Sequence, residues 1–262
     1  MNIQWIKWKL MLTTLPITLS ILLLKYVIVE VLNYEGLVKF SEISLVITGG
    51  IFLLGFMLAG TMTDYKESEK IPAELACVLE SIEDTIALGY SVKPVFNLHD
   101  LKNKLHEATD TIILWFGNSE LEQTVFTKIN EIGIITGTLE KAGMGPIASR
   151  ITGEQHNLRK LITRVNVIKK TGFLASGYAF LEVLTVIIIG LLLISKFENF
   201  VSSVIITSFV TQIFIYMVRL IKDIDQPFEY SSSGIKGAAE VDLFPIYDYS
   251  RRAKTRLASE IS

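Results

Sequence analysis

The chain has 262 residues, of which half are hydrophobic and a fifth are charged, and its mean hydropathy is +0.44. This composition is too apolar for an ordinary soluble globular protein. The 25 Lys and Arg residues nearly balance the 27 Asp and Glu residues, which argues against a nucleic-acid-binding protein held by a basic surface. The single cysteine, Cys77, excludes an internal disulfide framework and a multi-cysteine metal site. We therefore expect an integral membrane protein.

Four apolar segments are each long enough to cross the hydrocarbon core of a bilayer, which takes about 20 helical residues. They are residues 10–32, 43–62, 173–194 and 200–221. The first has a basic start, but no small-residue cleavage site follows it, so it is predicted to be an uncleaved anchor rather than a signal peptide.

The positive residues indicate how the segments are oriented. The links between spans one and two and between spans three and four carry one lysine each, Lys39 and Lys196, whereas residues 63–172 carry thirteen Lys and Arg. Because cytoplasmic loops of membrane proteins carry an excess of Lys and Arg, both termini and the middle segment are predicted to be cytoplasmic. The predicted parts are residues 1–62 (N-terminus and two spans), 63–172 (cytoplasmic helices), 173–221 (two spans) and 222–262 (cytoplasmic tail).

The cytoplasmic segment reads as helical throughout. Pro72 is placed to open a first helix, Asn97 to cap a second, and Ser119 with Glu122 to form the capping box of a third. Residues 143–146, Gly-Met-Gly-Pro, interrupt the pattern before a fourth helix. No alternating strand pattern of useful length occurs, so the predicted fold class is all-α, with four transmembrane helices and long cytoplasmic helices.

Motifs for catalysis are absent from the sequence. The Gly-Met-Gly segment lacks the residues of a phosphate-binding loop, and no nucleophile signature is present. The histidines lack partners at metal-ligand spacing, so we expect solvated side chains at His99, His106 and His156. The acidic residues Glu80, Glu83 and Asp84 are expected to form a solvated helix face. We predict no enzyme activity, no metal and no cofactor.

Glu182 lies within the third predicted span, where an ionised carboxylate is costly unless it is paired or faces water. One interpretation is that Glu182 lines or titrates in a pathway. The other is that it is a protonated or hydrogen-bonded group that fixes helix contacts, with Gln212 or Thr211 of the fourth span as its partner. The two interpretations are weighted evenly.

The second span carries the most informative pattern in the chain. Thr48, Phe52 and Phe56 recur every four residues and therefore project from one helix face. The neighbouring Gly49, Gly50 and Gly55 permit close helix approach, as small residues do in membranes. Such a stripe is usually packed or lipid-facing, but rings of phenylalanine around an oligomer axis also form hydrophobic constrictions.

The segment after the fourth span contains a helix stop. Asp223 precedes Gln226-Pro227-Phe228, in which the proline ends the helix. The rest of the tail is expected to be extended, with aromatic residues near position 246 packing it back onto the cytoplasmic helices. A basic cluster at 251–256 is expected to be solvated or close to lipid headgroups.

These residues together resemble the bestrophin family of anion channels and its bacterial relatives. The family's pore helix has phenylalanines four and eight positions after an aliphatic residue, and a glycine precedes the second. Here the pattern falls on Thr48, Phe52 and Phe56, with Gly55 before the last. The layout of two spans, a helical insert and two further spans is also similar.

Two further motifs carry the resemblance. Residues 182–186, Glu-Val-Leu-Thr-Val, are similar to a Gln-Val-Val-Thr-Val motif of the family's third span. Residues 226–229, Gln-Pro-Phe-Glu, are similar to the turn that forms part of the calcium clasp of animal members. The acidic run of that clasp is replaced by Tyr230 and three serines, and the family's paired tryptophans by Asp64-Tyr65.

The resemblance implies a homopentamer in the plasma membrane or bacterial inner membrane, with inorganic ions as its cargo and lipid as its surroundings. Thr48, Phe52 and Phe56 would line the neck of an axial pore. Anion selectivity, as in a chloride channel, and cation selectivity both stay open, and Glu182 would favour cations if it faced the pathway. The alternatives are a non-conducting scaffold whose cytoplasmic helices bind a partner protein and, less favoured, a proton-coupled transporter.

Overall fold

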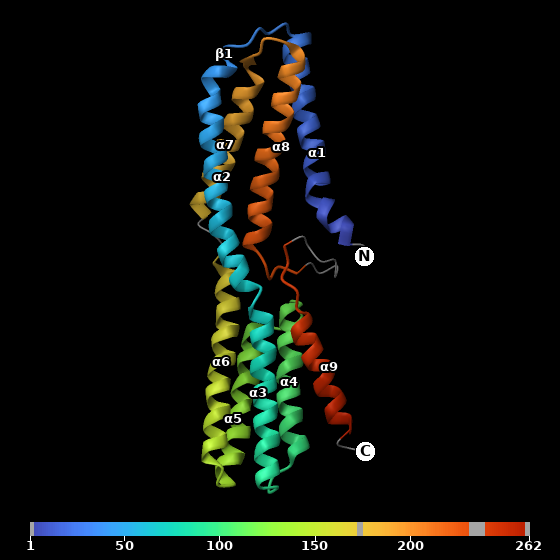
Figure 1. Ribbon diagram of the computed structural model, residues 1–262, viewed down its shortest axis with the longest axis vertical. Helices are drawn as coiled ribbons and strands as arrows, with labels where there is room; N and C mark the ends of the chain where they lie inside the picture. The colour runs from blue at the N-terminus through green and yellow to red at the C-terminus, as the bar shows by residue number, and fades with distance from the viewer. Residues whose placement is uncertain (1–2, 172–174, 231–238, 260–262) are drawn as a thin grey trace. The chain divides into compact units, whose positions relative to one another are not determined.

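The structure is a computed structural model that describes residues 3–171, 175–230 and 239–259, and it is almost entirely helical (Figure 1). The chain divides into two compact units. We call the first the membrane unit; it comprises Met1–Tyr65, Gly172–Pro227 and Lys236–Glu240. We call the second the bundle unit; it comprises Lys66–Thr171, Phe228–Ile235 and Val241–Ser262. The all-α fold class with four membrane helices is confirmed.

The helices of the membrane unit are long and apolar enough to cross a bilayer. They are α1 (Ile3–Tyr26), which continues into a short π-helix η1 (Val27–Val31), α2 (Phe40–Ser68), α7 (Ala175–Leu193) and α8 (Phe200–Asp225). Four stretches qualify by length and hydropathy: Trp8–Val31, Phe40–Val92, Ser176–Leu193 and Phe200–Asp225. The second stretch includes both α2 and the following α3, because only Glu69 and Lys70 separate these helices. The expected crossing part of it is residues 43–62.

The core of the membrane unit lies between α2, α7 and α8. Its members are the buried apolar side chains Ile43, Ile47, Leu54, Met57, Leu181, Ile188, Leu192, Phe214 and Ile221. Gly50 makes the close packing of α2 possible, since a Cβ atom there would lie 2.8 Å from both Ile188 Cδ1 and Phe214 Cζ. α1 packs against α8 on another side.

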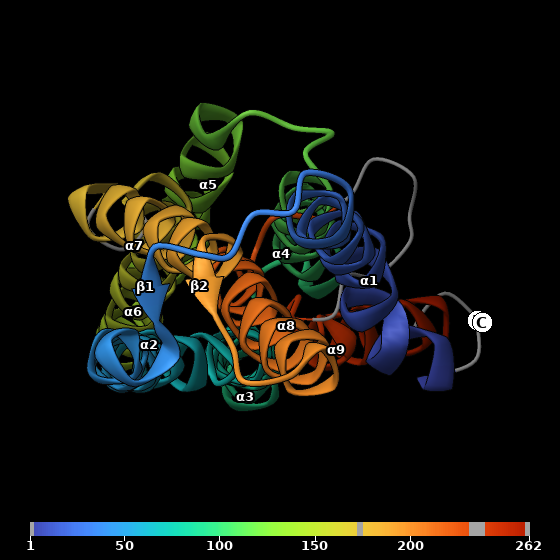
Figure 2. The ribbon, with the colours of Figure 1, turned by 90° about the horizontal axis from the view of Figure 1, so that it is seen from above.

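Two short strands lie in the links between the membrane helices, one before α2 and one between α7 and α8. They were not predicted from the sequence. β1 (Val38–Lys39) pairs in parallel with β2 (Ser195–Lys196), as seen from above in Figure 2. Gly36 precedes β1 with a φ of +85°, and a Cβ atom on it would lie 2.8 Å from the backbone nitrogen of Lys196. A glycine is therefore required for the first link to approach the second.

The bundle unit contains α3 (Ile71–Val92), α4 (Leu98–Phe116), α5 (Glu122–Lys141), α6 (Gly145–Lys170) and α9 (Phe244–Ser259). The side chain of Asn97 caps α4 by accepting a 3.1 Å hydrogen bond from the amide of Asp100, as predicted. The predicted capping box at Ser119 is wrong. Leu121 is the N-cap residue of α5 and makes no side-chain cap bond. The amide of Ser119 instead donates to the carbonyl of Leu114 and so completes the end of α4.

The expectation of an extended tail is wrong for residues 244–259, which form α9; the serine-rich part of that prediction, residues 231–234, lies outside the described residues. Its buried residues Ile246, Tyr249, Ser250 and Ala253 recur at helical spacing, and they pack this helix against α3 and α4. Among the aromatic residues expected to pack back, Tyr249 is buried, whereas Phe244 and Tyr247 are exposed. One face of α9 therefore docks and the other stays open.

Candidate functional site

The face of α2 that carries the phenylalanine stripe points away from the core of the membrane unit. The exposed fractions of Phe52 and Phe56 are 67% and 62%. The two rings contact each other edge to face, with centroids 4.6 Å apart. The hydroxyl of Thr48 donates to the carbonyl of Ser44 on its own helix at 2.9 Å, so its donor is already satisfied. The stripe is thus an apolar ridge that a second molecule or lipid can reach.

The three glycines beside the stripe have different surroundings. Gly50 faces the core, where its missing Cβ is needed. Gly49 and Gly55 have no atom of another part of the described chain within 4 Å of an added Cβ. The expectation of close helix approach therefore holds within the chain for Gly50, and the other two glycines leave the stripe side of α2 open.

Glu182 has a different partner from the one expected. It forms an ion pair with Lys222 of α8 and no hydrogen bond to Gln212 or Thr211 in the described part of the chain. α7 and α8 are joined only by residues 194–199, so the first half of α7 lies beside the last turns of α8. Lys222 is therefore within reach, and the charge of the carboxylate is balanced by an ammonium group.

Gln212 links α8 to α1. Its amide nitrogen donates to Thr14 Oγ1 at 2.7 Å, and its amide oxygen accepts from Thr18 Oγ1 at 2.6 Å. Both of these polar groups are satisfied between two membrane helices, where an unpaired amide would be costly. The geometry gives Gln212 a role in helix association.

A buried lysine in the first span was missed by the sequence reasoning. Lys25 is only 3% exposed, donates to the carbonyl of Leu192 at 2.5 Å and lies 4.1 Å above the ring centroid of Phe197. It thereby satisfies a carbonyl in the last turn of α7. A charged residue inside a predicted span was the available signal.

The predicted turn follows α8 directly. Asp223 lies in the last turn of that helix, Gln226 is its C-cap residue, and Pro227 and Phe228 are buried. In the bundle unit the ring of Phe228 packs 5.7 Å from that of Phe116. The described residues include no group of three His, Cys, Asp or Glu side chains able to hold a metal ion. Phe228 therefore contributes to the aromatic packing of the bundle unit.

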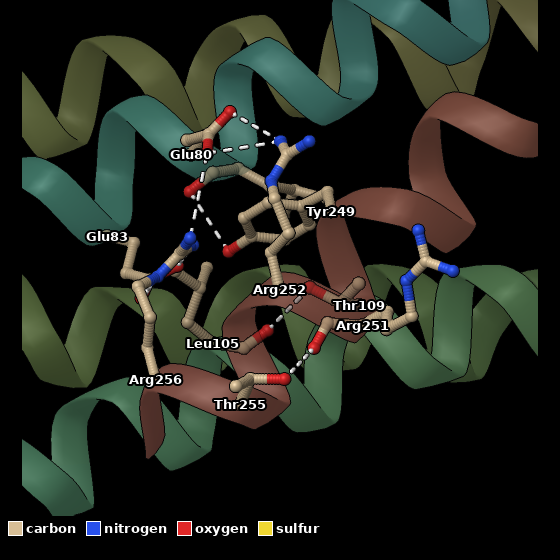
Figure 3. A network of polar contacts seen from close by, with 10 residues as sticks. Glu80, Glu83, Leu105, Thr109, Tyr249, Arg251, Arg252, Thr255 and Arg256 are labelled. Carbon is tan, nitrogen blue, oxygen red and sulfur yellow. Dashed lines mark hydrogen bonds and ion pairs between the residues drawn. The ribbon is translucent and has the colours of Figure 1, made fainter. Parts of the chain in front are cut away.

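Two arginines of α9, Arg252 and Arg256, are paired with Glu80 and Glu83 of α3 (Figure 3). Arg252 donates to both carboxylate oxygens of Glu80 at 3.2 and 3.0 Å. Arg252 uses a single nitrogen for both bonds, whereas Arg256 binds Glu83 with two, Nε donating to one carboxylate oxygen and Nη2 to the other. The expectation of a solvated side chain is wrong for Glu83, which the docking of α9 buries, whereas Glu80 and Arg252 form their ion pair while still partly exposed to solvent. Asp84 is exposed, as expected.

The histidines also differ from expectation. His156 is exposed, but a ring nitrogen of His99 and both ring nitrogens of His106 are buried. The side chain of His106 is only 11% exposed. Burial between α4 and its neighbours, which no local pattern reveals, accounts for this.

The sequence matches no protein-family model, and no curated protein sequence matches it. Solved structures are similar. A bacterial bestrophin homologue from Klebsiella pneumoniae superposes with a TM-score of 0.74 at 12% identity, over 95% of this chain and 98% of that chain. A single-substitution variant of a bestrophin homologue from the same organism gives a TM-score of 0.73 at 13% identity, over 92% and 97% of the two chains. A crystal structure of a membrane protein variant gives 0.74 at 12%, over 92% and 97%.

The likeness extends over nearly the whole chain and includes both units. It agrees with the resemblance that the stripe of α2 and the Pro-Phe turn indicated in the sequence. This membrane protein with four apolar helices therefore has the fold of the bacterial bestrophin homologues.

Proposed function

We propose that the chain is the subunit of a homopentameric ion channel in the plasma or inner membrane, with both termini in the cytoplasm. In this proposal the α2 helices surround an axial pore, and Thr48, Phe52 and Phe56 form its hydrophobic neck. The observation that carries the proposal is the stripe on α2, which is exposed in the single chain while the opposite face of the same helix is buried. The bestrophin fold of the chain supports it.

The arrangement of side chains on α2 suits this role. Apolar rings around an axis restrict water and ions by dewetting, and the edge-to-face contact of Phe52 with Phe56 holds two rings on one ridge. The open sides of Gly49 and Gly55 leave room for a neighbouring helix to approach. Glu182 is neutralised by Lys222, so it adds no net charge to a pathway.

Planar-bilayer recording tests the neck. Replacing both Phe52 and Phe56 by alanine is expected to raise the unitary conductance or the open probability, because it widens the constriction. Phe209→Ala is the matched control, since Phe209 is equally exposed, at 68%, but lies on α8. Unchanged currents in the double variant, or the same increase in Phe209→Ala, would contradict the assignment.

Particle symmetry tests the assembly. Negative-stain images of the detergent-solubilised protein are expected to show five-fold rings with an axial hole. Monomers or dimers without a hole would instead support a scaffold that binds a partner through its cytoplasmic helices. Reconstitution with separate anion and cation gradients then identifies the ion that passes.

A further inference from the structure

A small cavity lies between α3, α4 and α9 in the bundle unit. It measures about 10 Å³, room for a single water molecule at most. Seven side chains line it: Glu83, Lys102, Leu105, His106, Tyr249, Ala253 and Leu257. The last three belong to α9, so this helix forms one wall of the cavity.

His106 is a lining side chain whose polar atoms lack hydrogen bonds within the described chain. Neither of its ring nitrogens has a partner there, and both are buried. The nearest carboxylate oxygen, Oδ2 of Asp110, is 4.0 Å from Nε2, which is too far for a hydrogen bond. A neutral imidazole tolerates this position far better than an imidazolium ion, since a buried charge without hydrogen bonds is much more costly than a buried dipole.

Charged groups surround this histidine on three helices. They are Glu83 of α3, Lys102 and Asp110 of α4, and Lys254 of α9, with the phenol of Tyr249 also beside the cavity. The two carboxylates are already engaged by α9: Arg256 binds Glu83, and Lys254 lies 3.2 Å from Asp110. Ser250 also donates to Asp110 at 3.3 Å. A proton on His106 would therefore compete with contacts that hold α9.

We propose that His106 makes the docking of α9 sensitive to pH, so that acidification releases α9 from α3 and α4. In the docked state the ring is enclosed and neutral. When α9 leaves, the cavity wall is removed, and the ring gains water as a hydrogen-bond partner for its charged form. Protonation thus favours the undocked state.

The electrostatic surroundings agree with this direction. Burial is the largest effect on the pKa of His106 and lowers it. The carboxylates of Asp110 and Glu83 raise this pKa and the ammonium of Lys254 lowers it, and the net result is a lowered pKa. A histidine in water has a pKa of about 6.5. Because the undocked state binds the proton more tightly than the docked state, a fall in pH below that value shifts the equilibrium towards undocking. The inference does not depend on the proposed channel activity.

Hydrogen exchange of the α9 amides in the full-length protein tests the proposal. After correction for intrinsic rates, exchange at residues 244–259 is expected to be faster at pH 5.5 than at pH 7.5, by up to about tenfold. The upper limit is the gain in protonation of an exposed histidine, with an ordinary pKa, over that interval. Both pH values lie above the usual range for carboxylate titration. The amides of α5 are the internal reference and are expected to stay equally protected.

Substitutions assign the effect to this side chain. His106→Leu and His106→Gln both remove the titrating ring, the first with an apolar and the second with a polar side chain, and α9 is expected to exchange equally at the two pH values in each. His99→Gln and His156→Gln are the controls and are expected to keep the response of the wild type. A wild-type protein without a pH response, a response that persists in the His106 variants, or one that disappears in either control would overturn the proposal.

Discussion

The guanidinium group of Arg256 on α9 donates two hydrogen bonds, of 2.9 and 2.6 Å, to the carboxylate of Glu83 on α3. The two residues are 173 positions apart, and Glu83 is only 5% exposed. Bidentate pairs of this kind combine charge with a fixed geometry. The contact therefore fixes the position at which α9 docks along α3.

Loss of that contact should loosen α9. Arg256→Met leaves the buried carboxylate of Glu83 without its partner, and we expect a cost of about 2 kcal/mol, lower than for a fully enclosed pair because Arg256 is partly exposed. That corresponds to roughly 30-fold faster hydrogen exchange in α9. Lys254→Met is the control, since both members of its pair with Asp110 are exposed, and a change below about fourfold is expected. Equal effects of the two variants would contradict the assignment.

Packing of α2 in the membrane unit depends on one glycine. Gly50→Ala places a methyl group 2.8 Å from Ile188 and Phe214, and we expect a loss of about 1–3 kcal/mol from overpacking. Thermal unfolding in detergent measures this as a lowered midpoint. Gly49→Ala is the matched control on the adjacent position and should keep or raise the midpoint, because alanine favours helix. Similar midpoints for both variants would count against the packing described for α2.

Lys25 fixes the end of α7. Lys25→Met keeps most of the side-chain volume but removes one of two donors to the carbonyl of Leu192, which keeps the hydroxyl of Ser195 at 2.8 Å. We therefore expect a destabilisation of about 1 kcal/mol, the value of one hydrogen bond. Lys39→Met, at an exposed position of β1, should change the unfolding midpoint little. The same thermal unfolding experiment compares them, and an unaltered midpoint for Lys25→Met would show that the ammonium contributes nothing.

Alkaline pH should also release α9, through Tyr249. Burial is the largest effect on the pKa of this phenol, and together with Glu83 it raises the pKa above the ordinary value of 10. The docked state therefore keeps its proton, while an exposed tyrosine loses it above about pH 10. The contribution to stability is complete below that pH and is lost as the pH rises further.

The measurement for Tyr249 is hydrogen exchange of α9 between pH 9 and pH 11, corrected for intrinsic rates. Tyr249→Phe keeps the ring but cannot ionise, so its α9 should show a smaller loss of protection over this range than that of the wild type. Lysine titration affects both proteins alike and cancels in the comparison. Identical profiles would rule out a role for the phenol.

The membrane helices could be predicted because their signal is local. A run of about 20 apolar residues suffices to identify a span, and the cap of α4 at Asn97 depends only on neighbouring residues. On α2, the spacing of Thr48, Phe52 and Phe56 correctly grouped these residues on one face. Both faces of that helix are apolar, however, so the periodicity could not tell which of them packs against α7 and α8.

The contacts of α9 could not be predicted, because they are long-range. Glu83 reads as part of a polar helix face when the sequence near it is considered alone, and Arg256 as part of a basic cluster. Only the docking of α9 on α3 pairs them. His106 illustrates the same limit, since α9, which lies much further along the chain, helps to bury it. Its neighbour Asp110 likewise accepts a hydrogen bond from the hydroxyl of Ser250, 140 residues away.

The parallel pairing of β1 with β2 constrains how α2 can move. β1 leads directly into α2, and β2 leads through residues 197–199 into α8. The strand pairing therefore holds the first residues of the two helices close together. A piston-like slide of α2 along α8 would break this pairing, whereas a tilt or a rotation about the tethered end would keep it. In the proposed channel, we therefore expect the phenylalanine ridge to move by a tilt or rotation of α2 about residues 38–39.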